Sequence, residues 1–222
     1  QIICMAWSFW NGKDPFLKER FFGLTGNQGN HGEDVKEVYF YQDSTPTHSY
    51  MKMLYKYPQA EFPYQTLVDE NKKASKLQDE YELLDTGIFD EDRYFDIVIE
   101  YAKQDAEDIV ASATIINRGP EAAKLWVLPT IWFRKFWFTG HEPFMPKITQ
   151  LNTHSFKAFN PKSGNYVFSF SGHKELVFCD NETNRKRLYN IPNERKSTKD
   201  AINDYLVNGD ASRLNSGSGT KV

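Results

Sequence analysis

Side chains that hydrogen-bond well to hydroxyl groups are crowded into one stretch of the chain: Asn27, Asn30, His31, Glu33 and Asp34. Glycines recur through this stretch at three-residue intervals: Gly23, Gly26, Gly29 and Gly32. Glycine lets a loop adopt positive φ and approach a ligand closely. An imidazole, amides and carboxylates in such a loop indicate a site for a hydroxyl-rich ligand, since sugars are bound by planar polar groups beside aromatic faces. The alternative is a long connection whose side chains bond their own backbone.

A second candidate is the aromatic patch Trp132-Phe133-Arg134, followed by Trp137 and Phe138. Arg134 beside Trp132 offers a stacking face together with a fork of hydrogen-bond donors. Packing in a core or between domains is the competing interpretation of the same rings. Trp132 and Arg134 are therefore included among the candidate substrate-binding residues.

A cluster of acidic residues precedes the middle of the chain: Asp85, Asp90, Glu91, Asp92 and Asp96. Grouped oxygen ligands suit calcium, but the spacing is not that of an EF-hand loop. A general acid and base must also be held apart across a cleft, which neighbours on one strand do not achieve. We therefore expect no metal site, no cofactor and no catalytic residue in this chain.

The composition of the chain argues against some classes of binding partner. The 222 residues include 27 basic and 30 acidic ones, with a net charge of −3 and a pI near 6.0. Without a basic excess to neutralise phosphates, we expect neither a nucleic acid nor a membrane as partner. Two cysteines, Cys4 and Cys179, are too few for a disulfide-stapled fold, which favours the cytoplasm, although the start of the chain is missing.

Period-two alternation and turn signals predict the elements that carry these residues. Strands are expected over residues 2–10, 35–41, 95–101, 109–115, 125–133, 153–159, 166–170 and 175–179, and a further one near 185–188. Residues 95–133 are expected to form a three-stranded meander, in which Pro129 marks an edge or a bulge. Short helices are expected near 47–57 and near 63–76, and a short amphipathic segment over 199–207.

Several stretches, taken in order, resemble the N-terminal region of large microbial enzymes of glycoside hydrolase family 63, the glucosidase-like group. They are WNGKDPFLKERFFGLTGNQGNHGEDVKEVYFYQDSTPTHSYMKMLYKYPQ at Trp10 to Gln59, YELLDTGIFDEDRYFDIVIEYAK at Tyr81 to Lys103, INRGPEAA at Ile116 to Ala123, LPTIWFR at Leu128 to Arg134 and NETNRKRL at Asn181 to Leu188. The chain departs from the family at Lys135-Phe136-Trp137, where Asn-Thr-Trp is expected.

The resemblance implies a mainly β fold, an antiparallel β-sandwich of the super-sandwich type with two or three short inserted helices. It implies one domain over residues 1–222, a fragment of a larger protein truncated at both ends, whose catalytic (α/α)6 helical barrel lies elsewhere. Such enzymes hydrolyse α-glycosidic bonds with inversion, using carboxylates of the barrel. The chain is then inactive alone, packs on the barrel, and contributes its 27–34 loop to the rim of a pocket for an oligosaccharide or α-glucoside.

Three alternatives remain open at this point. The loop can brace the barrel without touching substrate. The chain can be a free-standing carbohydrate-binding module, although strands cut at both ends leave open sheet edges. A third alternative is an independent sandwich enzyme of the sugar-epimerase type, with His31 and Glu33 as acid and base.

Overall fold

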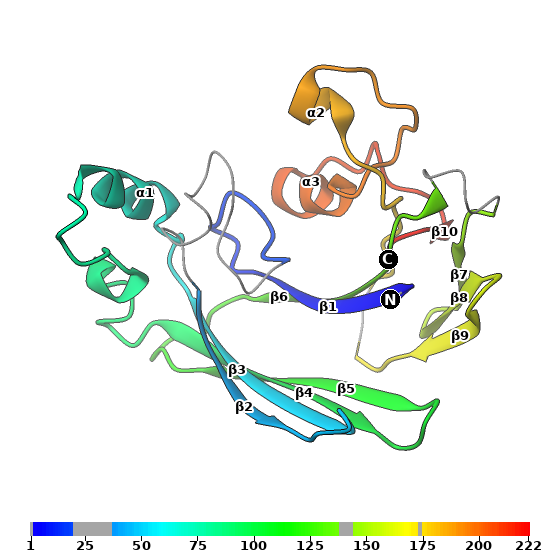
Figure 1. The fold of residues 1–222 in the computed structure, drawn as a ribbon, viewed down its shortest axis with the longest axis horizontal. Coiled ribbons are helices and arrows are strands. Elements are labelled where there is room, and N and C mark those ends of the chain that lie inside the picture. The colour runs from blue at the N-terminus through cyan, green and yellow to red at the C-terminus, as the bar shows by residue number, and fades with distance from the viewer. Residues whose placement is uncertain (1, 20–36, 138–143, 173–174) are drawn as a thin grey trace. The chain divides into compact units, whose positions relative to one another are not determined.

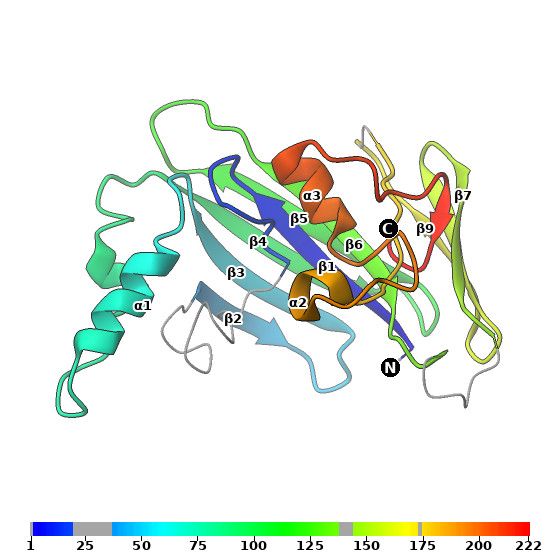
Figure 2. The same cartoon turned by 90° about the horizontal axis from the view of Figure 1, so that it is seen from above.

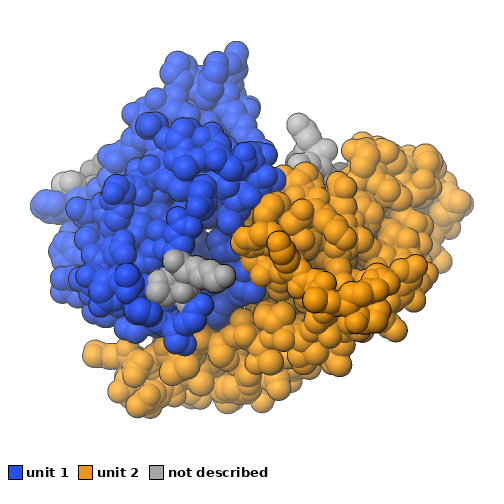
Figure 3. All heavy atoms as spheres, turned by 180° about the vertical axis from the view of Figure 1, so that it is seen from behind, with its two compact units in different colours: residues 1–8, 127–222 blue, residues 9–126 orange. Residues whose placement is uncertain are grey.

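The computed structural model describes residues 2–19, 37–137, 144–172 and 175–222. Within these ranges the chain is mainly β, with antiparallel sheets and three α-helices. This confirms the fold class predicted from the sequence. The chain divides into two compact units, residues 1–8 with 127–222 (unit 1) and residues 9–126 (unit 2) (Figure 3). The sequence predicts a single domain over residues 1–222, and the division into two compact units does not test that prediction.

Unit 2 contains a four-stranded antiparallel meander, seen along its length in Figures 1 and 2. Its strands, in order, are β2 (Val38–Ser44), β3 (Tyr50–Pro58), β4 (Tyr94–Lys103) and β5 (Ile109–Asn117). Tyr55 of β3 pairs with Tyr39 of β2 and with Ile97 of β4. Tyr55 and Ile97 are fully buried, so the centre of the sheet lies in the core.

Strand β3 corrects the helix expected near 47–57. Tyr50, Met51, Leu54 and Tyr55 fit a helical face, but Met51, Met53, Tyr55 and Tyr57 also alternate with the lysines at 52 and 56. The segment forms a strand and not a helix because the strand pairs with β2 and β4 on its two edges. This pairing also buries the Tyr55 and Tyr57 side chains completely. When a short segment fits both the helical and the strand period, its pairing with other strands determines which structure forms.

The helix expected near 63–76 is confirmed as α1 (Tyr64–Lys73). It packs against the 3₁₀ helix η2 (Leu83–Thr86) around a small core of Phe62, Leu67, Val68 and Leu83. Pro63 stands just before the first turn, where its missing N–H costs nothing. Basic residues close the helix, which suits its dipole.

Strands β1 (Ile3–Trp10) and β6 (Trp126–Phe133) form a two-stranded sheet. The meander expected over 95–133 is therefore wrong in its last strand, since β6 pairs with β1 and not with β5. Ile131 of β6 also exchanges both backbone hydrogen bonds with Val222. The edge or bulge predicted at Pro129 stays a prediction.

Unit 1 also holds a four-stranded antiparallel sheet. Its strands, in order, are β10 (Ser218–Gly219), β7 (Lys147–Asn152), β8 (Ser155–Asn160) and β9 (Gly164–Ser169). Its core contains Ile131, Phe133, Ile148, Phe156, Ala158, Phe178 and Val222. The strand expected over 175–179 is reduced to isolated bridges at Phe178 and Cys179.

Two helices complete unit 1. The strand expected near 185–188 is wrong, because α2 (Arg185–Tyr189) begins there, with Asn184 accepting a hydrogen bond from the Arg187 N–H. The amphipathic segment expected over 199–207 is α3 (Ala201–Asn208). Among the described residues, no helix combines the length and apolar character needed to cross a bilayer.

Candidate functional site

The two ends of the glycine-rich stretch meet in unit 2. The five loop residues predicted to bind substrate, Asn27, Asn30, His31, Glu33 and Asp34, lie outside the described residues. Lys18 precedes that stretch and Glu37 follows it. The Lys18 ammonium donates a hydrogen bond to Glu37 Oε1, and the two charges form an ion pair. The structure thus places an ionic clamp at the base of the predicted site.

A tight turn brings Lys18 to this place. The Asn11-Gly12 and Asp14-Pro15 turn signals end β1, and Gly12 adopts a φ of 78°. The Asn11 side-chain oxygen accepts hydrogen bonds from the backbone N–H groups of Lys13 and Asp14, each at 2.9 Å. This is the Asx turn typical of such sequences. The chain then returns antiparallel, with reciprocal backbone hydrogen bonds between Phe9 and Lys18.

The clamp is buried on all sides. The Lys18 and Glu37 side chains are 4% and 3% exposed. The second carboxylate oxygen of Glu37 accepts a hydrogen bond of 2.8 Å from the Tyr55 hydroxyl, in the centre of β3. The Lys18 ammonium also lies 3.5 Å from the ring centroid of Phe62 and 4.4 Å from that of Tyr64. These cation–π contacts replace part of the lost hydration of the ammonium.

Burial dominates the electrostatics of the clamp. It lowers the pKa of Lys18 and raises the pKa of Glu37, while the attraction between the two charges opposes both shifts. Burial also raises the pKa of Tyr55, whose hydroxyl stays a donor to Glu37. An ion pair in such a place is costly to assemble and contributes little net stability over an apolar pair. Its value lies in fixing a particular arrangement of the chain.

A second buried carboxylate, Asp14, extends the cluster. Asp14 accepts hydrogen bonds from the Tyr57 hydroxyl, from the Phe62 N–H at 2.7 Å and from the Asn11 amide at 3.4 Å. The Asn11 amide also donates to the carbonyls of Pro58 and Ala60. These contacts join the turn after β1 to the segment that leads from β3 into α1. We name the set Asn11, Asp14, Lys18, Glu37, Tyr55 and Tyr57 the stem cluster.

The stem cluster is built to position rather than to react. Each oxygen of the Asp14 and Glu37 carboxylates already accepts at least one hydrogen bond from the protein. These hydrogen bonds hold both carboxylates to fixed donors of the protein. The Lys18–Glu37 ion pair joins described residues on either side of positions 20–36.

Trp132 and Arg134 are the two predicted binding residues that the structure describes, and both belong to unit 1. Trp132 is half-buried in β6 and bridges to Lys221. Arg134 is exposed, and its guanidinium carbon lies 5.1 Å from the ring centroid of Phe136. Arg134 thus contacts a ring of its own chain, and the substrate-binding role of Trp132 and Arg134 stays a prediction.

The neighbouring Trp137 is engaged in the structure of unit 1. Its indole N–H donates to Glu182 at 2.8 Å, and Lys135 forms an ion pair with the same carboxylate. The adjacent Asn181 begins the sequon Asn181-Glu182-Thr183, and its amide donates to the Phe133 carbonyl at 2.8 Å. The nitrogen that a glycan would need is therefore used to hold β6.

The acidic cluster considered for calcium is divided among other partners. Asp85 accepts a hydrogen bond from the Glu82 N–H, and Glu91 pairs with Arg93. Asp96 pairs with both Lys56 and Arg118. Within the described ranges, no group of three or more His, Cys, Asp or Glu side chains is arranged to hold a metal ion.

Sequence reasoning missed the stem cluster. The pairing of Lys18 with Glu37 crosses 19 positions of sequence, and Lys18 stands next to Glu19 and Arg20, a charged run typical of a solvent-facing segment. The tyrosines at 55 and 57 also share one face of a strand once β3 is read with period two.

Comparison with known proteins adds one relative. The chain is 38% identical over 259 aligned residues to uncharacterized protein YMR196W of Saccharomyces cerevisiae. The match covers 100% of this chain and 24% of the yeast protein, so the chain spans about a quarter of that relative's length. No model of a known protein family matches the chain, and no solved structure matches it.

Proposed function

We propose that this chain is a non-catalytic, β-rich N-terminal part of a longer inverting α-glycosidase of the glucosidase-like kind. Its partner is an (α/α)6 catalytic barrel in the same protein, and the substrate of the whole enzyme is an oligosaccharide or α-glucoside. The loop at residues 27–34 forms part of the rim of the substrate pocket. The enzyme works in the cytoplasm, which a sequence with only two cysteines favours.

The stem cluster is the observation that carries this proposal. Its buried Lys18–Glu37 ion pair joins the residues on either side of the polar, glycine-rich stretch in the sequence. Fixing both ends of such a stretch reduces the conformational entropy that a ligand must overcome on binding. A pocket rim benefits from this more than an ordinary surface connection does.

The chemistry of the chain's carboxylates favours placing catalysis in the barrel. Inverting hydrolysis needs two carboxyl groups about 6.5–9.5 Å apart with a water between them. The buried carboxylates Asp14 and Glu37 are bound to donors of the protein itself, so we assign the acid and base to the barrel. The relative about four times as long as this chain is in keeping with a large further region.

Rim contact and bracing predict different effects of loop substitutions in the longer protein. If His31 and Glu33 bind sugar hydroxyls, His31→Ala and Glu33→Ala each raise KM for an α-glucoside about 2- to 10-fold, the worth of one hydrogen bond to a neutral group. The thermal unfolding midpoint stays unchanged. Steady-state kinetics and thermal unfolding of the same preparations check this.

Glu107→Ala, a change of the same kind in an exposed turn of unit 2, serves as the control and is expected to alter neither quantity. A lower unfolding midpoint with an unchanged KM would assign the loop to bracing. Unchanged values for both loop variants would remove the loop from the site altogether.

A further inference from the structure

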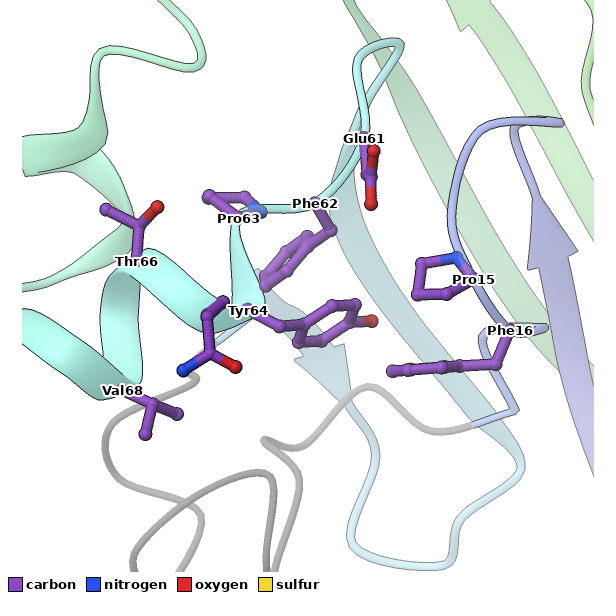
Figure 4. Close-up of a pocket in the computed structure, with 9 residues that line it drawn as sticks. Pro15, Phe16, Glu61, Phe62, Pro63, Tyr64, Thr66 and Val68 are labelled. Atoms are coloured by element: carbon purple, nitrogen blue, oxygen red, sulfur yellow. The ribbon is translucent and has the colours of Figure 1, made fainter.

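A hollow of about 490 Å³ opens in unit 2 beside the stem cluster (Figure 4). Pro15 and Phe16 of the turn after β1 line one side. The other side is the segment from Glu61 into the first turns of α1. The volume lies within the range of about 300–1,000 Å³ typical of small-molecule sites. Among the described residues, Trp132 and Arg134 are not part of its lining.

The hollow has an aromatic wall with fixed geometry. The ring centroids of Phe16 and Tyr64 are 4.6 Å apart, and those of Phe62 and Tyr64 are 4.5 Å apart. Phe62 is buried behind them, over the Lys18 ammonium. Proline rings at 15 and 63 restrict the backbone on both sides. The half-exposed Phe16 ring offers a face on which a flat ligand can stack.

One buried polar group in this wall has no partner. The Tyr64 hydroxyl makes no hydrogen bond with any described residue and has almost no exposed surface. It lies on the side of Pro15 and Phe16, and the Glu61 carboxylate is directed toward the same side (Figure 4). Burial, followed by the negative charges of Glu37 and Asp14, raises the pKa of Tyr64, so the hydroxyl remains protonated and able to donate.

The remaining lining supplies donors opposite the Glu61 acceptor. Within the described chain, α1 starts without a side-chain cap and without an acidic residue in its first turn. The backbone N–H groups of Gln65 and Thr66, which line the hollow, have no partner inside the helix. The Glu61 carboxylate in the lining, together with the charges of Glu37 and Asp14 that act on Tyr64, disfavours an anion. A neutral ligand with many hydroxyl groups uses donors and acceptors together.

We propose that this hollow is a non-catalytic carbohydrate-binding site that takes one or two pyranose rings. One sugar face stacks on Phe16, and the sugar hydroxyls bond to Glu61, to the open turn of α1 and to the Tyr64 hydroxyl. The preference for α-linked glucose units rests on the proposed function. The affinity for hydroxyl-rich rings rests on the hollow alone.

The test is titration of the 222-residue chain with maltose, followed by calorimetry and by NMR. We expect binding with a Kd of about 1 mM, as for a shallow site with few anchors. Phe16→Ala is expected to weaken binding at least about 10-fold. Phe159→Ala, which removes an exposed ring of unit 1, is expected to leave binding unchanged.

Tyr64→Phe separates binding from folding. Removing an unpartnered buried hydroxyl is expected to raise the thermal unfolding midpoint by about 2–4 °C. The same change weakens maltose binding about 2- to 10-fold. Tyr189→Phe, at an exposed tyrosine, should change neither the unfolding midpoint nor the maltose affinity.

Absence of maltose binding by the folded chain, or binding that Phe16→Ala leaves intact, overturns the proposal. Hydrolysis by the longer protein can be present in either case, so this failure is distinct from failure of the proposed function.

Discussion

Lys18→Met lowers the free energy of unfolding of the chain by about 3–5 kcal/mol, because it leaves the Glu37 carboxylate buried without its counter-charge. Methionine keeps much of the length and apolar stem of lysine, so the loss reports the charge more than the packing. Urea unfolding of the wild-type and variant chains measures the difference.

Two further variants isolate the ion pair. Lys18→Met combined with Glu37→Leu is expected to recover most of the lost stability, since an apolar pair of similar size replaces both charges. Lys73→Met, at the exposed pair Lys73–Glu70, is expected to leave the unfolding curve unchanged. A double variant that loses as much as the sum of the single ones would mean that the two charges do not act together.

Asp14→Ala is expected to destabilise the chain by about 2–5 kcal/mol. The substitution removes the acceptor of the buried Tyr57 hydroxyl and of the Phe62 N–H. Each donor left without an acceptor costs about 1–3 kcal/mol. Tyr57→Phe alone should cost less, because the Asp14 carboxylate keeps its other donors. The measurement is again urea unfolding.

The combination of Asp14→Ala with Tyr57→Phe provides the control. If the two groups act through one hydrogen bond, the combined loss is smaller than the sum of the single losses. Additive losses would show that Asp14 stabilises the chain by a different route.

The sequence was informative where one period dominated a segment. Strands β4 and β5 alternate clearly, and α1 carries a proline at its start and basic residues at its end, so both types of element could be predicted. Strand β3 was misread because its tyrosines and methionines satisfy both the helical and the strand period. The partner of β6 could not be predicted, since β1 lies more than a hundred residues away.

The sequence likewise predicted only part of the candidate site. Residue types alone pointed to the 27–34 loop, and that prediction stays a prediction, since the loop lies outside the described residues. The stem cluster could not be predicted, because lysine and glutamate usually face solvent and only the fold shows that Lys18 and Glu37 do not. The hollow likewise depends on the meeting of Pro15 and Phe16 with the start of α1.

The most direct test of the central claim is the anomeric form of the sugar released from an α-glucoside. The longer protein, of which we propose this chain is a part, is incubated with the substrate and followed by NMR before mutarotation. We expect initial release of the β-anomer by the longer protein and no hydrolysis by the isolated 222 residues. Release of the α-anomer, absence of any α-glucoside hydrolysis by the longer protein, or hydrolysis by the isolated chain would contradict it.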